Sequence, residues 1–195
     1  MSSSPVLRLA SASPRRRELL AQIGVPHVVA VADVDESARD GEAVTAYVER
    51  VARAKAAAIW ERGQELPVLG ADTTVVLDGV SLGKPQDRAH GLAMLEALAG
   101  REHRVLTAVA LVTAAGTHCL TSTSTVRMRA STPQERHRYW DTGEPRDKAG
   151  GYAIQGLGAV FIEALQGSYS GVMGLPLFET ARLLAAAGLP CWSPS

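Results

Sequence analysis

Short apolar runs alternate along the chain with segments in which apolar residues recur every three or four positions. Residues 6–10 predict a strand, residues 14 to about 22 a helix after it, and residues 43–62 a long helix. The same patterns predict further strands at 27–32, 67–77, 80–82, 104–113, 117–129 and 159–165, and further helices at 87–98, 132–143 and 175–187. Asp78-Gly79 and Ala115-Gly116 predict hairpin turns. Alternating strands and helices indicate an α/β fold, and the hairpins indicate that its sheet is mixed.

The length of the chain suits one domain, and we expect a single domain over residues 1–195. We also expect the sheet to be long and curved, with a second lobe attached through residues 104–150. A hydrophobic content of 46% with 21% charged residues is typical of a globular protein.

Charge and cysteine content narrow the class of protein. Twenty basic and twenty acidic residues give a formal net charge of zero, which argues against a nucleic-acid-binding protein. No apolar stretch reaches the roughly 18 residues that span a membrane, and the N-terminus lacks the pattern of a signal peptide. Cys119 and Cys191 are too few for a disulfide framework. We therefore expect a cytoplasmic protein with neither a membrane nor a nucleic-acid partner.

The start of the first predicted helix carries basic residues where acidic residues are usual. Ser13 is a typical N-cap residue and Pro14 a typical first helical residue, but Arg15, Arg16 and Arg17 follow. Helix N-termini favour acidic side chains, and each cation there costs about 0.3–1 kcal/mol. A solvated basic turn is one explanation. An anion bound by backbone N–H groups and guanidinium groups, where a strand passes into a helix, is the other, and we favour it.

An acidic side chain in an apolar strand is the second anomaly. Asp72 lies among Val, Leu and Thr residues, where a carboxylate is costly unless a cation or metal accompanies it. An Asp solvated at a strand end is the alternative. Only three of the twenty basic residues are lysines, and two of them, Lys84 and Lys148, stand beside or near glycines in predicted loops. Lys55 lies on the long helix.

Several motifs that carry these residues occur in one order along nearly the whole chain. They are LASASPRR at 9–16, GADT at 70–73, GKP at 83–85, DKAGGYAIQGLG at 147–158 and GLPL at 174–177. In these motifs the chain resembles the Maf family of nucleoside triphosphate pyrophosphatases. The resemblance implies cleavage between the α and β phosphates with a divalent metal, Mg²⁺ or Mn²⁺. It also implies an inosine-triphosphatase-like fold, with two lobes and a central cleft, and a homodimer.

The resemblance further implies roles for single residues. Arg15, Thr73 and Gln155 match the branch of the family that acts on dTTP and UTP, with Thr73 and Gln155 at the pyrimidine base. The remaining residues are expected at the triphosphate: Ser11, Ser13, Arg15 and Arg16 as binding groups, Lys55 and Lys84 as cations, Asp72 as general base or metal ligand, and Glu36 as a second metal ligand.

Two other functions stay open at this point. One is a nucleotide-binding regulator of septum formation without catalysis, and the other is a pyrophosphatase of the 7-methyl-GTP type. A regulator would need cations for the phosphates but would have no use for a buried carboxylate such as Asp72.

Overall fold

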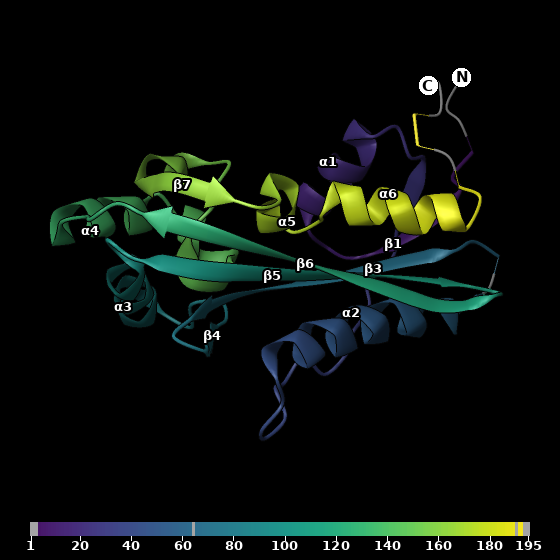
Figure 1. Ribbon diagram of the computed structural model, residues 1–195, viewed down its shortest axis with the longest axis horizontal. Helices are drawn as coiled ribbons and strands as arrows, with labels where there is room; N and C mark the ends of the chain where they lie inside the picture. The colour runs from purple at the N-terminus through teal and green to yellow at the C-terminus, as the bar shows by residue number, and fades with distance from the viewer. Residues whose placement is uncertain (1–3, 64, 190, 193–195) are drawn as a thin grey trace. The chain divides into compact units, whose positions relative to one another are not determined.

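A computed structural model describes residues 4–63, 65–189 and 191–192, which form a mixed α/β structure (Figure 1). Residues 1–3, part of the segment in which we expected no signal peptide, lie outside the described residues. The strands are β1 (Leu7–Ala10), β2 (His27–Val29), β3 (Val68–Leu77), β4 (Val80–Leu82), β5 (Glu102–Thr113), β6 (Gly116–Met128) and β7 (Ile162–Gln166). The helices are α1 (Pro14–Gln22), α2 (Val44–Trp60), α3 (Arg88–Leu98), α4 (Pro133–Asp141), α5 (Tyr169–Met173) and α6 (Leu177–Ala186), with 3-10 helices η1 (Glu144–Asp147), η2 (Ala149–Gly151) and η3 (Leu157–Phe161).

The strands form one seven-stranded sheet in the order β2-β1-β3-β5-β6-β7, with β4 paired to β3. The β1 strand runs parallel to both β2 and β3, whereas β3–β4 and β6–β7 are antiparallel. The mixed sheet that the hairpins predicted is therefore confirmed. No helix among the described residues is long and apolar enough to span a bilayer.

The chain divides into two compact units. Unit 1 extends to Asp72 and also includes residues 107–122 and the chain from Gly174 onward. Unit 2 consists of residues 73–106 and 123–173.

In unit 1, α2 covers one face of the strands, and α1 and α6 lie on the opposite face (Figure 1). The buried side of α2 carries small and branched apolar residues, among them Val48, Ala52 and Ala56. Gly70 on β3 lets α2 approach closely, since a Cβ there would lie 2.8 Å from the backbone nitrogen of Ala56. The strand and the helix are thus in backbone contact beside Asp72.

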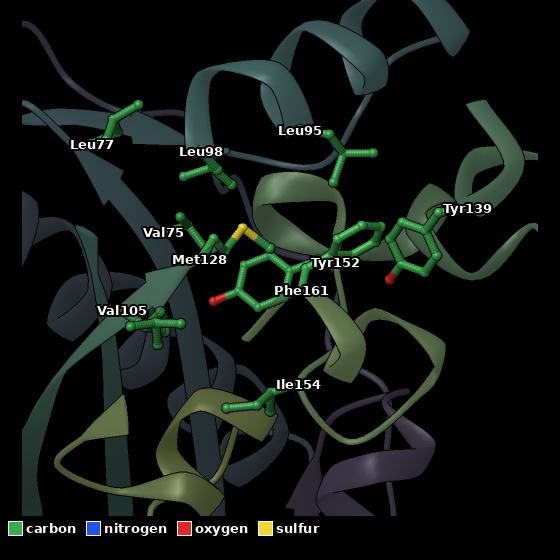
Figure 2. Close-up of a cluster of buried hydrophobic side chains, with 11 residues drawn as sticks. Val75, Leu77, Leu95, Leu98, Val105, Met128, Tyr139, Tyr152, Ile154 and Phe161 are labelled. Carbon is green, nitrogen blue, oxygen red and sulfur yellow. The ribbon is translucent and has the colours of Figure 1, made fainter. Parts of the chain in front are cut away.

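The core of unit 2 is a cluster of buried apolar side chains, in which Met128, Tyr152 and Phe161 lie close together (Figure 2). It combines residues of β3, α3, β5, β6 and α4 with the segment that follows α4. Its members are Val75, Leu77, Leu95, Leu98, Val105, Val126, Met128, Tyr139, Tyr152, Ile154 and Phe161.

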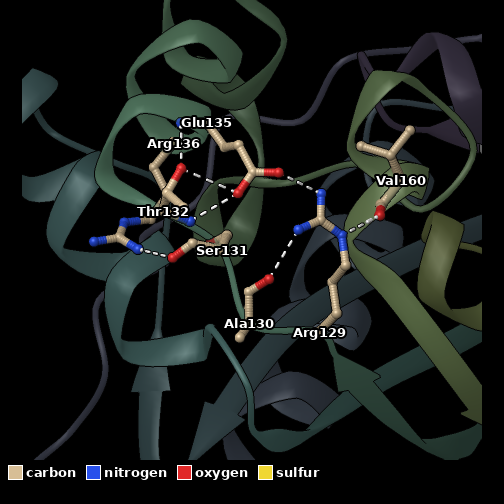
Figure 3. A network of polar contacts seen from close by, with 7 residues as sticks. All are labelled: Arg129, Ala130, Ser131, Thr132, Glu135, Arg136 and Val160. Carbon is tan, nitrogen blue, oxygen red and sulfur yellow. Dashed lines mark hydrogen bonds and ion pairs between the residues drawn. The ribbon is translucent and has the colours of Figure 1, made fainter.

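The start of α4 is fixed by a capping box. The Glu135 N–H donates to the Thr132 hydroxyl at 3.2 Å, and the Thr132 N–H donates to the Glu135 carboxylate at 2.7 Å (Figure 3). Arg129 also donates to Glu135 and to the carbonyl of Val160. These bonds tie the end of β6 to the start of α4 and to η3.

Three expectations about the elements need correction. The strand expected at 159–165 begins only at Ile162, because residues 157–161 form η3. The carboxylate of Glu144 accepts the N–H groups of Leu157 and Gly158, both at 2.9 Å, and so holds this segment in a turn rather than a strand. The strand expected at 27–32 ends at Val29, and the short helix α5 was not predicted.

Candidate functional site

The parallel pairing of β1 and β3 explains why the two anomalous segments of the sequence meet. Ala10 on β1 is paired with Gly70 on β3, and the two strands run in the same direction. Ser11 and the basic turn therefore leave the sheet at the edge where Asp72 lies, which is where α/β sheets commonly bind ligands.

Lys55 links two carboxylates at this edge. Its Nζ lies 2.9 Å from Oδ1 of Asp72 and 3.0 Å from Oε1 of Glu36. Asp72 is 6% exposed and Lys55 9% exposed, so this ion pair is buried. Burial raises the pKa of the Asp72 carboxyl, while the neighbouring Lys55 and Arg16 charges counteract part of that rise. A carboxylate that gains a proton easily beside fixed cations is typical of a functional site.

Arg16 lies close enough to Asp72 and Glu36 to interact electrostatically with both carboxylates. Its pKa is lowered by burial, while Asp72 and Glu36 act in the opposite direction. Its Nη1 donates to the Ser11 hydroxyl at 3.2 Å and its Nε to the carbonyl of Gly174 at 2.7 Å. The guanidinium is thus held between the start of α1 and the chain before α6. The structure brings the basic turn and the lone acid of the strand together.

Two details at the basic turn differ from the expectation. Ser13 occupies the N-cap position of α1, but among the described residues its side chain forms no capping hydrogen bond. Its backbone N–H donates to the Ser11 hydroxyl at 3.2 Å, so this group is already satisfied. The expected set of free N–H groups around Ser13 is therefore smaller than the sequence indicated, because the Ser11 hydroxyl serves both Ser13 and Arg16.

Tyr47 also lies beside these residues, and it was not among the residues expected at the site. Its hydroxyl donates to the backbone carbonyl of Glu36 at 3.0 Å. Burial raises its pKa, and the charges of Asp72 and Glu36 raise it further. Tyr47 precedes Lys55 by two helical turns, so both lie on one side of α2. That spacing was the signal in the sequence that could have identified it.

Asp72 and Glu36 fit a divalent cation. A single ammonium group already lies within 3.0 Å of an oxygen of each carboxylate, and carboxylate oxygens are preferred ligands of Mg²⁺ and Mn²⁺. Within the described segments there is no cluster of three or more His, Cys, Asp or Glu side chains suited to a metal. A cation at this pair would therefore take its other ligands from water and phosphate oxygens, as Mg²⁺ commonly does.

Arg15 is half-buried on α1 in unit 1. The other predicted site residues, Thr73, Lys84 and Gln155, belong to unit 2. Thr73 is half-buried on β3, and Lys84 and Gln155 are exposed. The N–H of Gly150 donates to the carbonyl of Gly83 at 3.0 Å, which joins the loop of Lys84 to the glycine-rich segment that leads to Gln155. The GKP motif and the glycine-rich motif thus form one substructure within unit 2.

Comparison with known proteins gives consistent results. The family model described as Maf-like protein matches residues 6–187. A dTTP/UTP pyrophosphatase of Hahella chejuensis is 54% identical over 190 residues, which cover 96% of this chain and 94% of the relative. A protein of the same name from Bordetella avium is 55% identical over 198 residues, with 97% and 98% covered.

Among solved structures, the Ham1 protein of Staphylococcus aureus shares the fold, with a TM-score of 0.50 and 17% identity over 80% of this chain and 79% of that one. The inosine-triphosphatase-like fold that the resemblance implied is confirmed by this match. With a family match over most of its length and relatives above 50% identity, this chain belongs to the Maf family.

Proposed function

We propose that this chain is a nucleoside triphosphate pyrophosphatase that hydrolyses dTTP and UTP to the monophosphate and pyrophosphate. The observation that carries the proposal is the cluster of Arg16 on α1, Lys55 on α2 and Asp72 in the middle of β3. It supplies fixed cations for a polyphosphate and a buried carboxylate beside them, in a family whose relatives bear the name dTTP/UTP pyrophosphatase.

In the proposed reaction, water attacks the α-phosphorus in line and pyrophosphate leaves. Negative charge increases on the phosphate oxygens in the transition state, so preorganised cations lower the barrier. Arg15 and Arg16 would bind the triphosphate through their guanidinium groups, with backbone N–H groups around Ser13 and the Ser11 hydroxyl as further contacts. Asp72 would either accept the proton of the attacking water or hold the metal that acidifies this water.

Lys55 would neutralise charge at the reacting phosphate from its position between Asp72 and Glu36. Lys84 is proposed as a second cation for the phosphates. Asp72 and Glu36 are the residues that would hold Mg²⁺ or Mn²⁺. Such a cation lowers the pKa of water and stabilises phosphate charge.

Thr73 and Gln155 are proposed to recognise the pyrimidine base. The amide of Gln155 offers one donor and one acceptor, which match the carbonyl and the imide N–H that uracil and thymine share. We also propose that the protein is a cytoplasmic homodimer. Sedimentation analysis at micromolar concentration tests the dimer, and a monomer at all concentrations would contradict it.

The function is tested by measuring pyrophosphate release from dTTP, UTP, CTP, GTP and 7-methyl-GTP, each with Mg²⁺, with Mn²⁺ and with EDTA. We expect turnover of dTTP and UTP with either metal and none with EDTA. Turnover of 7-methyl-GTP alone would support the alternative branch. Binding of nucleotide without any product would support the regulator instead.

A further inference from the structure

The acidic loop that carries Glu36 is fastened to α2 by a small set of contacts. We call residues 33–42 the Glu36 loop; it directly precedes α2. The Tyr47 hydroxyl donates to the carbonyl of Glu36 at 3.0 Å, and Nη2 of Arg50 donates to the carbonyl of Ser37 at 2.9 Å. Two side chains of α2 therefore hold two consecutive carbonyls of the loop, one of them that of Glu36 itself.

Arg50 also binds the far end of the loop. Its Nε and Nη2 contact the two oxygens of the Glu42 carboxylate, each at 2.7 Å, which is a bidentate pair. Only 21% of the Arg50 side chain and 11% of the Glu42 side chain are exposed. The pair lowers the pKa of Glu42 to about 2, so the carboxylate is ionised at any physiological pH. Surface ion pairs are usually worth little, but this one is bidentate and mostly enclosed.

The loop has few other ties of its own among the described contacts. The Ser37 N–H donates to Asp35 at 2.9 Å, and the Arg39 N–H donates to Glu42 at 3.2 Å. Both bonds stay within the loop and do not attach it to the rest of unit 1. Because Glu36 is itself half-exposed, its position over Lys55 depends on where the backbone of the loop is held.

We propose that Arg50, together with Glu42, is a positioning residue that holds the Glu36 carboxylate at Lys55 and Asp72. Arginine is required because three donor contacts in one plane reach a carboxylate and a carbonyl at once, whereas lysine offers a single point charge. The catalytic part of this inference depends on the function proposed above. Its structural part, the placement of the Glu36 loop, does not.

The test compares Arg50→Met with Arg53→Met. Arg53 lies one turn further along the same helix, and its ion pair with Glu49 is longer, at 3.8 Å, and more exposed. Loss of a residue that orients a metal ligand typically lowers activity or metal affinity about 10–100-fold. We expect this loss in kcat/KM with UTP for Arg50→Met, a smaller loss for Arg50→Lys and for Glu42→Gln, and a change below about twofold for Arg53→Met.

To separate a general structural role of Arg50 from positioning of Glu36, Arg50→Met is also measured in the Glu36→Gln variant. If Arg50 acts through Glu36, then adding Arg50→Met to Glu36→Gln lowers kcat/KM by less than about twofold further, since the group being positioned is already lost. If the double variant instead shows the product of the two single losses in kcat/KM, Arg50 affects activity independently of Glu36 and the inference is wrong. Wild-type kcat/KM in Arg50→Met would overturn it as well.

Hydrogen exchange gives a readout without activity. Arg50→Met should speed amide exchange of residues 36–38 at least tenfold while the amides of α2 stay protected, and Arg53→Met should leave both unchanged. If Arg50→Met does not fold, Glu42→Gln is measured in its place. Unchanged exchange in the loop overturns the positioning role. Faster exchange in a protein that hydrolyses no triphosphate would contradict the proposed function and leave the placement of the loop supported.

Discussion

The close contact between β3 and α2 at Gly70 yields a specific prediction. Replacing Gly70 with Ala places a Cβ 2.8 Å from the backbone nitrogen of Ala56 and closer still to the carbonyl oxygen of Ala52. Both opposing atoms belong to the backbone of α2, so no side-chain rotation relieves the overlap. The helix must move outward by roughly 1 Å to restore an ordinary contact.

The shift has two separate consequences. Overpacking of this kind costs about 1–3 kcal/mol in the free energy of unfolding. Lys55 lies on α2 between the two contacted residues, and Asp72 follows Gly70 by two positions on β3. Their hydrogen bond of 2.9 Å would lengthen beyond hydrogen-bond range. A misplacement of this size commonly lowers the rate about 10²-fold, so we expect that loss in kcat with UTP.

Urea unfolding and steady-state kinetics measure the two effects separately. Gly91→Ala is the matched control. Its Cβ would overlap the ring of Trp140 in unit 2, and none of Arg16, Lys55 and Asp72 is among the residues it would contact. We expect Gly91→Ala to lower the free energy of unfolding, and we expect the folded variant to have a kcat within threefold of wild type. Gly70→Ala with wild-type stability and wild-type kcat would refute the view that this backbone contact sets the distance between Lys55 and Asp72.

Two further predictions concern unit 2. Burial lowers the pKa of His103 to about 4, whereas the pKa in the unfolded chain is about 6.5. Between these two pH values the unfolded chain binds a proton that the folded chain does not. The free energy of unfolding therefore decreases by about 3 kcal/mol in total as the pH falls from 6.5 to 4. The free energy of unfolding, measured with urea across that pH range, should fall less steeply in His103→Gln than in the control His118→Gln, because His118 is exposed. Equal slopes in the two variants would be evidence against a lowered pKa of His103. Gln155→Glu should lower kcat/KM for UTP about tenfold or more, because an acceptor replaces the amide donor, and an unchanged substrate profile would remove Gln155 from base recognition.

The sequence was most informative where a residue violated a local rule. Three arginines at a helix start and an aspartate in an apolar strand cost free energy locally, and the structure brings one of these arginines, Arg16, close to Asp72. Strand and helix periodicity then predicted that β1 and β3 each continue into this region. The parallel pairing of Ala10 with Gly70 was not visible in the sequence, since register depends on the whole sheet.

Residues that act through long-range contacts were missed. Tyr47 and Arg50 have ordinary places in a helical pattern, and nothing local indicates that their partners lie in the loop before α2. Glu144 is a similar case, because its carboxylate turns residues 157–161 into a 3-10 helix from 13 and 14 positions away. Lys55 was expected at the triphosphate from the family resemblance, whereas its bonds to Asp72 and Glu36 needed the tertiary structure.

The central claim is that Asp72 performs chemistry on a triphosphate held by neighbouring cations, and Asp72→Asn tests it most directly. UTP binding by calorimetry with Ca²⁺, pyrophosphate release with Mg²⁺, and the melting temperature are measured on the same preparation. We expect turnover to be lowered about 10²-fold or more. Binding within about threefold of wild type would assign Asp72 the role of general base, and a larger loss of binding would assign it the role of metal ligand. The melting temperature shows whether Asp72→Asn, in which Glu36 remains the ion-pair partner of Lys55, is still folded. Wild-type turnover in Asp72→Asn would contradict the account.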